Sequence, residues 1–356
     1  MHTSLFHTPA PPFVIAGPCS IEHHEQLRHS VAALAELEQV SMVRCGIWKP
    51  RTRPGGFEGL GEPALVWVDE LREQYPTLRF CCEVARPEHV ELCLRHRIDA
   101  VWIGARTSGN PFSVGELAQA LQGCSLAVMV KNPIAADVNL WQGAIERVMQ
   151  AGVHDVAAIH RGFFFYHDGE PYRNKPLWEV PVELRRRMPD IPLLCDPSHM
   201  GGRRCYLEEL MLTASDLGYD GYMIEVHPHP DEALTDSEQQ IDTAELRRLL
   251  GRLAQYRQED NIDIRLNILR QQIDAIDERL IRALGDRMDI SRKIAQLKQT
   301  SHMAAYQPQR WETLLRERIA TAREAGLDSS FMRILYETIH AESIRTQENV
   351  FANGES

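Results

Sequence analysis

The chain has 356 residues, of which 44% are hydrophobic and 25% charged, a globular composition that excludes a disordered or fibrous protein. At roughly 150 residues per domain, this length predicts two domains, or one large barrel with an appended module. Acidic residues outnumber Lys and Arg by 50 to 39, and the formal charge of −11 argues against sequence-independent binding to nucleic acid or to an anionic membrane.

The sequence also predicts a cytoplasmic protein with no membrane partner. Residues 1–12 have neither a basic start nor an apolar stretch, and no run of 18 apolar residues occurs. Eight cysteines in a long chain without a signal peptide are typical of reduced thiols.

Up to residue 245, short β-rich runs alternate with amphipathic helical stretches, which is the pattern of a parallel α/β fold. The predicted strands are 13–17, 42–47, 79–84, 99–104, 126–131, 155–160, 191–196 and 221–226. Eight parallel strands in this length fit a closed (β/α)8 barrel better than an open doubly wound sheet. The first strand is not followed by a GxGxxG motif, which disfavours a dinucleotide-binding fold.

Beyond residue 250 the pattern becomes all-helical. Apolar residues recur at helical spacing from Ile262 to about Thr300, which predicts one helix about 58 Å long. Two shorter helices should follow, from Pro308 to Arg323 and from Ser329 to about Val350. They cannot cover the whole first helix, so we expect its apolar stripe to pack against a second copy in an intertwined dimer. The expected domains are a barrel over 1–245, a helical linker over 246–261 and a helical domain over 262–356.

Chemically capable residues follow almost every predicted strand. In a closed barrel these strand ends share one face, where active sites are built. One set of cations there would bind phosphate or carboxylate groups, because guanidinium and ammonium groups bind such oxyanions. These cations are Arg44, Lys49, Arg51, Arg106, Lys131 and Arg161. A second set offers a thiol, an imidazole and two carboxylates, which suit a divalent transition ion that polarises a carbonyl group. These ligands are Cys19, His199, Glu225 and Asp236.

Each of these residues alone also has a structural interpretation. Cys19 could be a core thiol, and His199 or Glu225 a hydrogen-bonded surface group. The ensemble favours function, because solvated loops rarely place such chemistry after eight successive strands. Two histidines one residue apart in the proline-stiffened segment 227–230 favour a wall of the site over metal ligands. Glu83 either orients a water molecule or neutralises the neighbouring cations.

Five motifs occur in the order GPCSIE, RCGIWKPRTRPGGFEGLG, IGARTSGN, DPSHMGGRR and EVHPHPDEALTDSEQQ. Over about residues 10–245 they resemble the type I-beta 3-deoxy-D-arabino-heptulosonate 7-phosphate (DAHP) synthases, which condense phosphoenolpyruvate with erythrose 4-phosphate. The resemblance implies a divalent metal, in the first place Mn²⁺, on the four ligands above. It implies a phosphoenolpyruvate site made of Arg44, Lys49, Arg106, Lys131 and Arg161, completed by Glu83, Gly104 and Ala105. It also assigns Arg51 and Thr52 to the phosphate of erythrose 4-phosphate, and proton transfer to Lys49.

The resemblance leaves one alternative substrate and two departures. The related 3-deoxy-D-manno-octulosonate 8-phosphate synthases share the barrel, but they have an Asn-containing segment where this chain reads KPRT, which favours the erythrose substrate. His160 stands where a Glu commonly precedes Arg-Gly. Pro133 follows Lys131-Asn132 where a Gly is common.

The helical tail carries cations and amides between apolar residues. These could be solvated faces, with Arg270 and Arg287 paired to acidic neighbours. Over residues 262–350, however, their spacing resembles the AroQ-type chorismate mutases, which convert chorismate to prephenate by a rearrangement that needs no metal. The resemblance implies that Arg287, Lys298 and Gln347 are catalytic and that Arg270 from the partner subunit, Arg310 and Ser343 bind substrate. Trp311 follows Arg310 at a position where the family commonly has a Glu, which leaves Glu312 as the candidate to recognise the substrate hydroxyl.

The sequence therefore predicts a bifunctional, homodimeric shikimate-pathway enzyme. The alternative is a barrel synthase with a catalytically silent helical domain for ligand sensing and dimerisation. Because the first barrel strand begins near residue 13, we expect no N-terminal regulatory domain and assign feedback inhibition by chorismate or prephenate to the tail.

Overall fold

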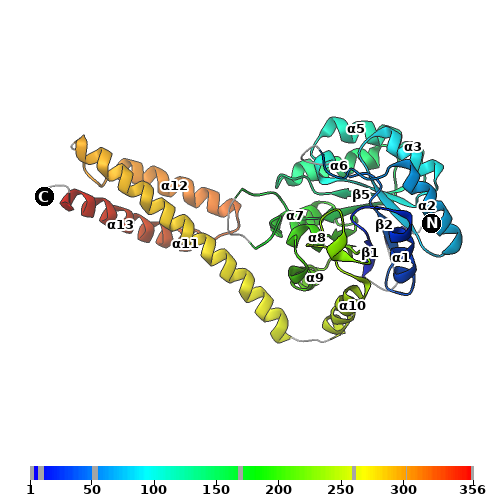
Figure 1. Cartoon of the computed structure of the whole chain (residues 1–356). Helices are drawn as coiled ribbons and strands as arrows, with labels where there is room; N and C mark the ends of the chain where they lie inside the picture. The colour runs from blue at the N-terminus through cyan, green and yellow to red at the C-terminus, as the bar shows by residue number, and fades with distance from the viewer. Residues whose placement is uncertain are drawn as a thin grey trace. The chain divides into compact units, whose positions relative to one another are not determined.

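The computed structural model describes residues 4–6, 12–49, 55–166, 171–258, 262–301 and 303–353. The chain forms two compact units, Met1–Asn261 and Ile262–Ser356, and each is described by itself (Figure 1). Within the described ranges, no helix has the length and apolar character needed to cross a membrane.

The first unit is a closed barrel of parallel strands, which confirms the predicted fold. The strands are β1 (Phe13–Gly17), β2 (Met42–Cys45), β3 (Phe80–Val84), β4 (Ala100–Ile103), β5 (Ala127–Lys131), β6 (Val156–His160), β7 (Leu193–Cys195) and β8 (Gly221–Glu225). Each strand pairs with the next, and β1 closes the barrel on β8, with Phe13 opposite Gly221 and Gly17 opposite Glu225. Every predicted run contains one strand.

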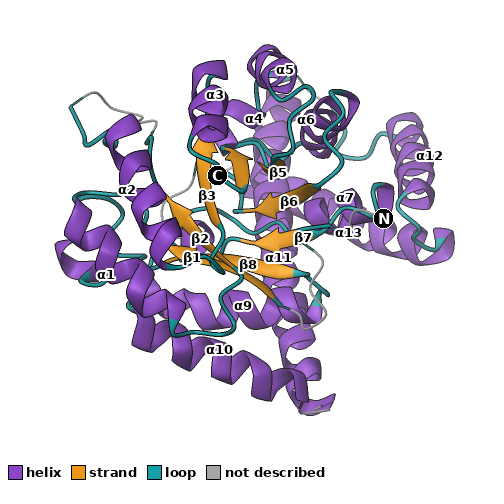
Figure 2. Ribbon diagram, turned by 90° about the vertical axis from the view of Figure 1, so that its right-hand side faces the viewer, coloured by secondary structure: helices purple, strands orange, loops and turns teal. Residues whose placement is uncertain are grey.

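Helices surround the strands, as Figure 2 shows. They are α1 (His24–Ala35), α2 (Glu62–Gln74), α3 (Pro87–Arg95), α4 (Ala105–Ser108), α5 (Pro111–Ala120), α6 (Val138–Gln150), α7 (Glu179–Arg187), α8 (Pro197–Gly201), α9 (Leu207–Asp216) and α10 (Thr243–Gln258). Alternate strand residues face opposite sides. In β1, Val14 and Ala16 pack in the layer between strands and helices, whereas Phe13 and Ile15 fill the barrel interior. Both faces are therefore apolar, and the polar chemistry is left to the strand ends.

Helix α10 covers most of the predicted linker and continues as helix to Gln258. Its side chains Leu246, Leu249 and Leu253 are buried in the same core as the barrel helices. The hydroxyl of Tyr256 donates to Asp216 Oδ2 on α9 at 2.7 Å. The contacts therefore place this helix in the barrel unit.

The second unit consists of α11 (Ile262–Thr300), α12 (Pro308–Glu324) and α13 (Ser329–Asn353). Pro308 lies in the first turn of α12, where its missing N–H costs no helical hydrogen bond, and Gly326 follows the helix with a left-handed φ of 77°. Helix α13 packs along α11, and α12 packs on α13 (Figure 1). Apolar side chains of α11 such as Ile273 and Leu280 remain half-exposed within one copy, at 56% and 50%.

Candidate active sites

Three predicted metal ligands meet at the C-terminal end of the barrel. Cys19 follows β1, Glu225 ends the neighbouring β8, and Asp236 lies in the loop beyond it. Their potential ligand atoms all lie within 4.8 Å of one another. The fourth predicted ligand, His199 on α8, brings Nε2 to 3.6 Å from Glu225 Oε1. The structure thus gathers all four residues from three strand ends.

The donor set fits a divalent transition ion. Glu225 Oε1 is buried and accepts no hydrogen bond from the described residues, although Arg44 Nη2 lies 3.1 Å away as an ion pair. Asp196 holds the His199 ring through Nδ1 at 2.8 Å, so that Nε2 faces Glu225. A carboxylate behind a ligating histidine commonly orients the ring and raises its basicity.

Lys49 supplies positive charge among these anionic groups. Its Nζ contacts Cys19 Sγ and lies 3.2 Å from Asp236 Oδ2. Burial opposes ionisation of Glu225, but His199, Arg44 and Lys49 outweigh it and lower its pKa to about 2. Burial raises the pKa of the Cys19 thiol well above its usual range, and Glu225 adds to the effect. A metal ion would therefore displace a proton from Cys19 but find Glu225 already ionised.

Two buried cations lie beside this cluster, on β2 and β5. The guanidinium of Arg44 lies 5.2 Å from the Trp102 ring centroid, and Lys131 Nζ lies 5.7 Å from the same ring. Lys131 donates to Asp196 Oδ2 at 2.7 Å. Arg44 Nε and Nη1 are buried without a hydrogen-bond partner among the described residues. Unused donors on a buried cation are suited to a bound oxyanion.

Arg161 extends this cationic surface beyond β6. Its backbone N–H donates to Asn132 Oδ1, and its Nη1 donates to Asn174 Oδ1, both at 2.7 Å. Burial lowers the pKa of Arg161 to about 10, and the nearby charges of Arg173 and Arg106 act in the same direction. Arg106 lies on α4 with an exposed side chain.

Glu83 and Gly104 fit together at the ends of β3 and β4. A Cβ on Gly104 would lie 2.1 Å from Glu83 Oε1, so a larger residue there would displace the end of the Glu83 side chain. Trp102 Nε1 donates to Glu83 Oε2 at 3.2 Å. Ala105 then begins α4. Arg51 and Thr52 lie outside the described residues.

In the second unit, the predicted site residue Ser343 on α13 contacts α11. Ser343 Oγ lies 2.8 Å from Ser291 Oγ, and Gln347 Nε2 donates to Ser343 Oγ at 3.5 Å. Lys298 Nζ donates to the carbonyl oxygen of Ala305 at 2.6 Å. Arg287 is partly buried, and burial lowers its pKa, which does not fit a fully solvated face.

The other two predicted arginines are exposed within one copy, Arg270 on α11 and Arg310 on α12. Glu312 is also exposed, whereas the ring of Trp311 stacks on that of His340.

Residues 8–260 match the family model "DAHP synthetase I family". The chain belongs to this family. Residues 269–348 match "Chorismate mutase type II", so the chain joins a DAHP synthase domain to a chorismate mutase domain.

The relatives agree with this division. A phospho-2-dehydro-3-deoxyheptonate aldolase of Thermotoga maritima is 31% identical over 229 residues, which cover 64% of this chain and 65% of that one. The chain thus spans slightly less than two thirds of that relative. The crystal structure of the T. maritima enzyme matches with a TM-score of 0.61 and 27% identity, covering 68% of each chain. A 4-amino-4-deoxychorismate mutase of Streptomyces pristinaespiralis is 33% identical over 89 residues, 25% of this chain and 69% of its own.

Three further residues of the DAHP synthase domain contact the predicted site residues, and sequence reasoning did not assign them to the site. Asp196 bonds both Lys131 and His199. Gln239 Nε2 donates to Glu225 Oε2 at 2.6 Å. Arg173 Nη1 donates to Asp236 Oδ1 at 3.0 Å. Asp196 and Gln239 lie within motifs that the sequence offered, but Arg173 comes from a loop without a recognisable pattern.

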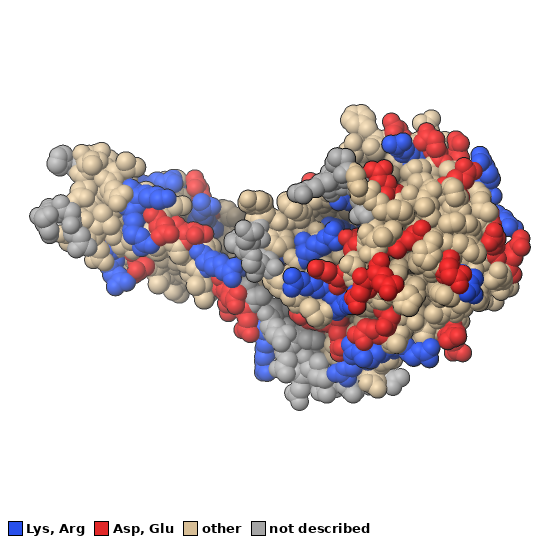
Figure 3. All heavy atoms as spheres, viewed as in Figure 1, with Lys and Arg blue, Asp and Glu red and all other residues tan. Residues whose placement is uncertain are grey.

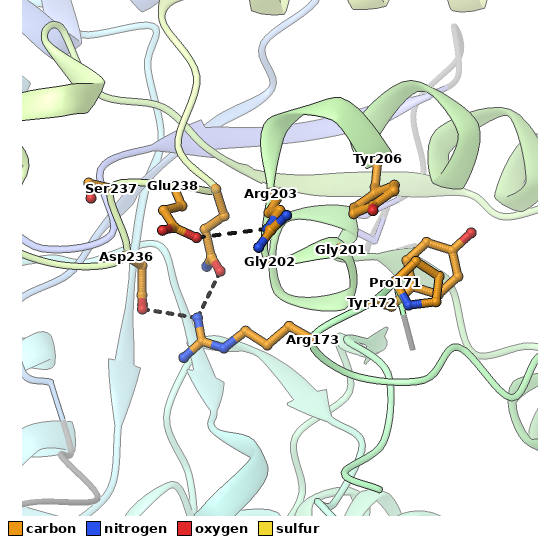
Figure 4. A pocket seen from close by; sticks show the side chains of 11 residues that line it. Pro171, Tyr172, Arg173, Gly201, Gly202, Arg203, Tyr206, Asp236, Ser237 and Glu238 are labelled. Carbon is orange, nitrogen blue, oxygen red and sulfur yellow. Dashed lines mark hydrogen bonds and ion pairs between the residues drawn. The ribbon is translucent and has the colours of Figure 1, made fainter. Parts of the chain in front are cut away.

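Arg173 and Asp236 face a pocket of about 520 Å³, shown in Figure 4. Arg173 reaches across it to Asp236 and Gln239, while Tyr172 and Tyr206 lie on the side away from Asp236. This hollow therefore reaches the predicted metal ligands of the DAHP synthase domain at Asp236.

His160 and His227 lie away from the ligand cluster. The His160 ring packs against Trp178 in the helical layer, with Nδ1 2.8 Å from the Tyr219 hydroxyl, and burial lowers its pKa to about 3. This replacement of the common Glu is accommodated by aromatic packing. His227 faces Glu22, with Nε2 3.8 Å from Oε2.

Proposed function

We propose that this protein condenses phosphoenolpyruvate with erythrose 4-phosphate to DAHP and phosphate, and rearranges chorismate to prephenate. The observation that carries the first activity is the cluster of Cys19, Glu225 and Asp236 beside the buried cations Arg44 and Lys131, in a DAHP synthase domain. The second activity rests on the mutase domain and the polar groups between α11 and α13. From the sequence, we propose that the protein acts in the cytoplasm.

In the barrel, a divalent ion held by Cys19, His199, Glu225 and Asp236, Mn²⁺ or an ion that replaces it, would polarise the aldehyde oxygen of erythrose 4-phosphate. Arg44, Lys131, Arg161 and Arg106 bind the carboxylate and phosphate of phosphoenolpyruvate. They hold its methylene carbon in attack geometry. Lys49 lies at the ligand cluster, where its ammonium can transfer a proton to the sugar oxygen. Glu83 faces the same site and either orients water or balances charge, and Arg51 with Thr52 receives the sugar phosphate.

In the helical domain, Arg287 and Lys298 bind the anionic substrate and stabilise negative charge that develops on its ether oxygen. Gln347 and Ser343 complete the contacts from α13, with Arg310 from α12. We assign Arg270 to the site of a second copy. The half-exposed apolar side chains of α11 support this homodimer, because its three-helix unit leaves them uncovered.

A second mutase substrate follows from the Streptomyces relative, whose name specifies 4-amino-4-deoxychorismate. Trp311, in place of the common glutamate, is the feature that favours testing it. A rate on the amino compound that exceeds the rate on chorismate would make it the preferred substrate.

We further propose that prephenate or chorismate in the helical domain inhibits the synthase. On the face shown in Figure 3, acidic and basic side chains are interspersed on both units, which argues against a nucleic-acid partner. The competing function is a silent sensing and dimerisation domain.

Purified full-length protein tests these functions together. We expect DAHP formation with erythrose 4-phosphate, slower turnover with arabinose 5-phosphate, and conversion of chorismate to prephenate. Prephenate should inhibit the synthase of the wild type but not of Lys298→Ala. Synthase activity without any mutase activity would support the silent sensor, and preference for arabinose 5-phosphate would support the octulosonate reaction. Equal inhibition of both proteins would contradict sensing through Lys298.

A further inference from the structure

The imidazole of His340 is held in a defined position in the second unit. It stacks flat on the Trp311 indole, with ring centroids 4.0 Å apart and planes 8° from parallel. Tyr306 contacts the same imidazole at 5.8 Å between centroids. A stack between α12 and α13 fixes the plane of the imidazole ring.

His340 shares a helix face with predicted substrate-binding residues. It lies three residues before Ser343 and seven before Gln347 on α13, a spacing that places side chains on the same side of a helix. Burial lowers the pKa of the His340 imidazole, and the positive charges of Arg287 and Lys298 lower it further, so the ring is neutral near pH 7. The imidazole therefore interacts electrostatically with both proposed catalytic cations.

His340 Nε2 is buried and has no hydrogen-bond partner among the described residues. In the described part of this unit, two other buried side-chain atoms share that condition, Arg287 Nη1 and Gln347 Oε1. Buried polar atoms are normally paired, and leaving them unpaired costs free energy. Three unpaired groups on the facing sides of α11 and α13 indicate one ligand with both anionic and neutral polar parts.

The chemistry of these side chains indicates which part of the ligand each of them binds. The Arg287 guanidinium only donates hydrogen bonds and matches a carboxylate. A neutral imidazole matches a hydroxyl group, because the imidazole and the hydroxyl each have a hydrogen to donate and a lone pair to accept one. Glu312 is exposed, and Trp311 presents its ring face to His340. His340 thus offers the neutral polar contact that neither of these neighbours supplies.

We propose that His340 is a specificity-determining residue whose Nε2 hydrogen-bonds the ring hydroxyl of chorismate, and that Trp311 is a positioning residue that holds the imidazole by stacking. This inference rests on the proposed mutase function. It replaces the expected role of Glu312 with a residue one helix away.

The test compares His340→Phe and His340→Gln in the full-length protein, on chorismate and on its analogue with an O-methylated ring hydroxyl. Phenylalanine keeps the stack but removes the nitrogens. We expect kcat/KM for chorismate to fall about 5- to 10-fold in His340→Phe and to recover partly in His340→Gln. On the analogue, His340→Phe should stay within about twofold of the wild type, because the lost bond is already weakened there.

Trp311→Phe and Trp311→Ala test the positioning role. We expect Trp311→Phe to retain the preference for chorismate over the analogue, and Trp311→Ala to lose it. Equal losses on both substrates in His340→Phe, or an unchanged rate on chorismate, would overturn the inference. A wild-type protein that binds prephenate in calorimetry but does not turn over chorismate would instead refute the mutase function. In that case, unchanged prephenate binding by His340→Phe would also refute the hydroxyl contact.

Discussion

Replacing Lys131 with methionine tests the oxyanion site of the barrel, because it removes the charge and keeps most of the side-chain volume. The ammonium is nearly enclosed, with 6% of the side chain exposed, and it lies 2.7 Å from the fully buried Asp196. A hydrogen bond to a charged group contributes about 1.5 to 3 kcal/mol. If Lys131 contacts phosphoenolpyruvate, kcat/KM for this substrate should therefore fall roughly 10- to 150-fold.

The same substitution should also destabilise the barrel. Removing one partner of a buried ion pair costs about 3 to 5 kcal/mol, and the low end applies because Asp196 keeps His199 at 2.8 Å. The assay follows phosphoenolpyruvate consumption at saturating erythrose 4-phosphate, with chemical unfolding measured in parallel. Arg95→Met is the control, since it breaks an exposed ion pair with Glu62 that is worth little. A kcat/KM within twofold of the wild type, combined with lower stability, would refute substrate binding and leave Lys131 a partner of Asp196.

Four further outcomes are expected. Chelation should abolish DAHP formation and spare the mutase, and loss of both activities would contradict separate sites. Cys19→Ser should lower bound metal measured by elemental analysis, since a hydroxyl replaces a thiolate poorly; an undiminished content would make Cys19 a core thiol. Arg287→Ala should reduce the mutase rate by at least about tenfold while DAHP formation persists, and a normal mutase rate would favour a solvated face. Burial lowers the pKa of His160 from 6.5 to about 3, so its contribution to stability is present above about pH 6.5 and is lost as the pH falls towards 3. Denaturant midpoints should therefore decline less steeply over this pH range in His160→Gln than in the wild type. Identical slopes would exclude His160 as a source of the pH dependence.

The barrel could be predicted because its strands are short apolar runs separated by helical patterns. The strand bounds could not, since pairing ends where the neighbouring strand ends. The run 191–196 thus contracts to Leu193–Cys195, and Cys195 pairs with His160, the last residue of β6. Closure depends on the pairing of Phe13 with Gly221, a contact between residues far apart in the chain that no local pattern encodes.

The site was predictable where function falls directly after a strand, as with Cys19 and Glu225. Arg173 and Gln239 were missed because their roles depend on how loops fold back over the barrel end. His340 had a usable signal, its helical spacing from Ser343 and Gln347. The stack with Trp311 needed the packing of two helices, which the sequence leaves open.

Helix α10 has a consequence for how such a chain is assembled. The leucines of α10 are buried against the barrel, and Tyr256 is hydrogen-bonded to Asp216. The core of the synthase domain is therefore complete only when the domain includes residues up to Gln258. A cut at residue 245 would expose an apolar groove and produce a protein prone to aggregation. Truncation after Gln258 keeps α10 packed on the barrel, so we expect that a different helical module can be joined there without changes to the barrel. A barrel that is joined to another helical module therefore has to keep its own last helix.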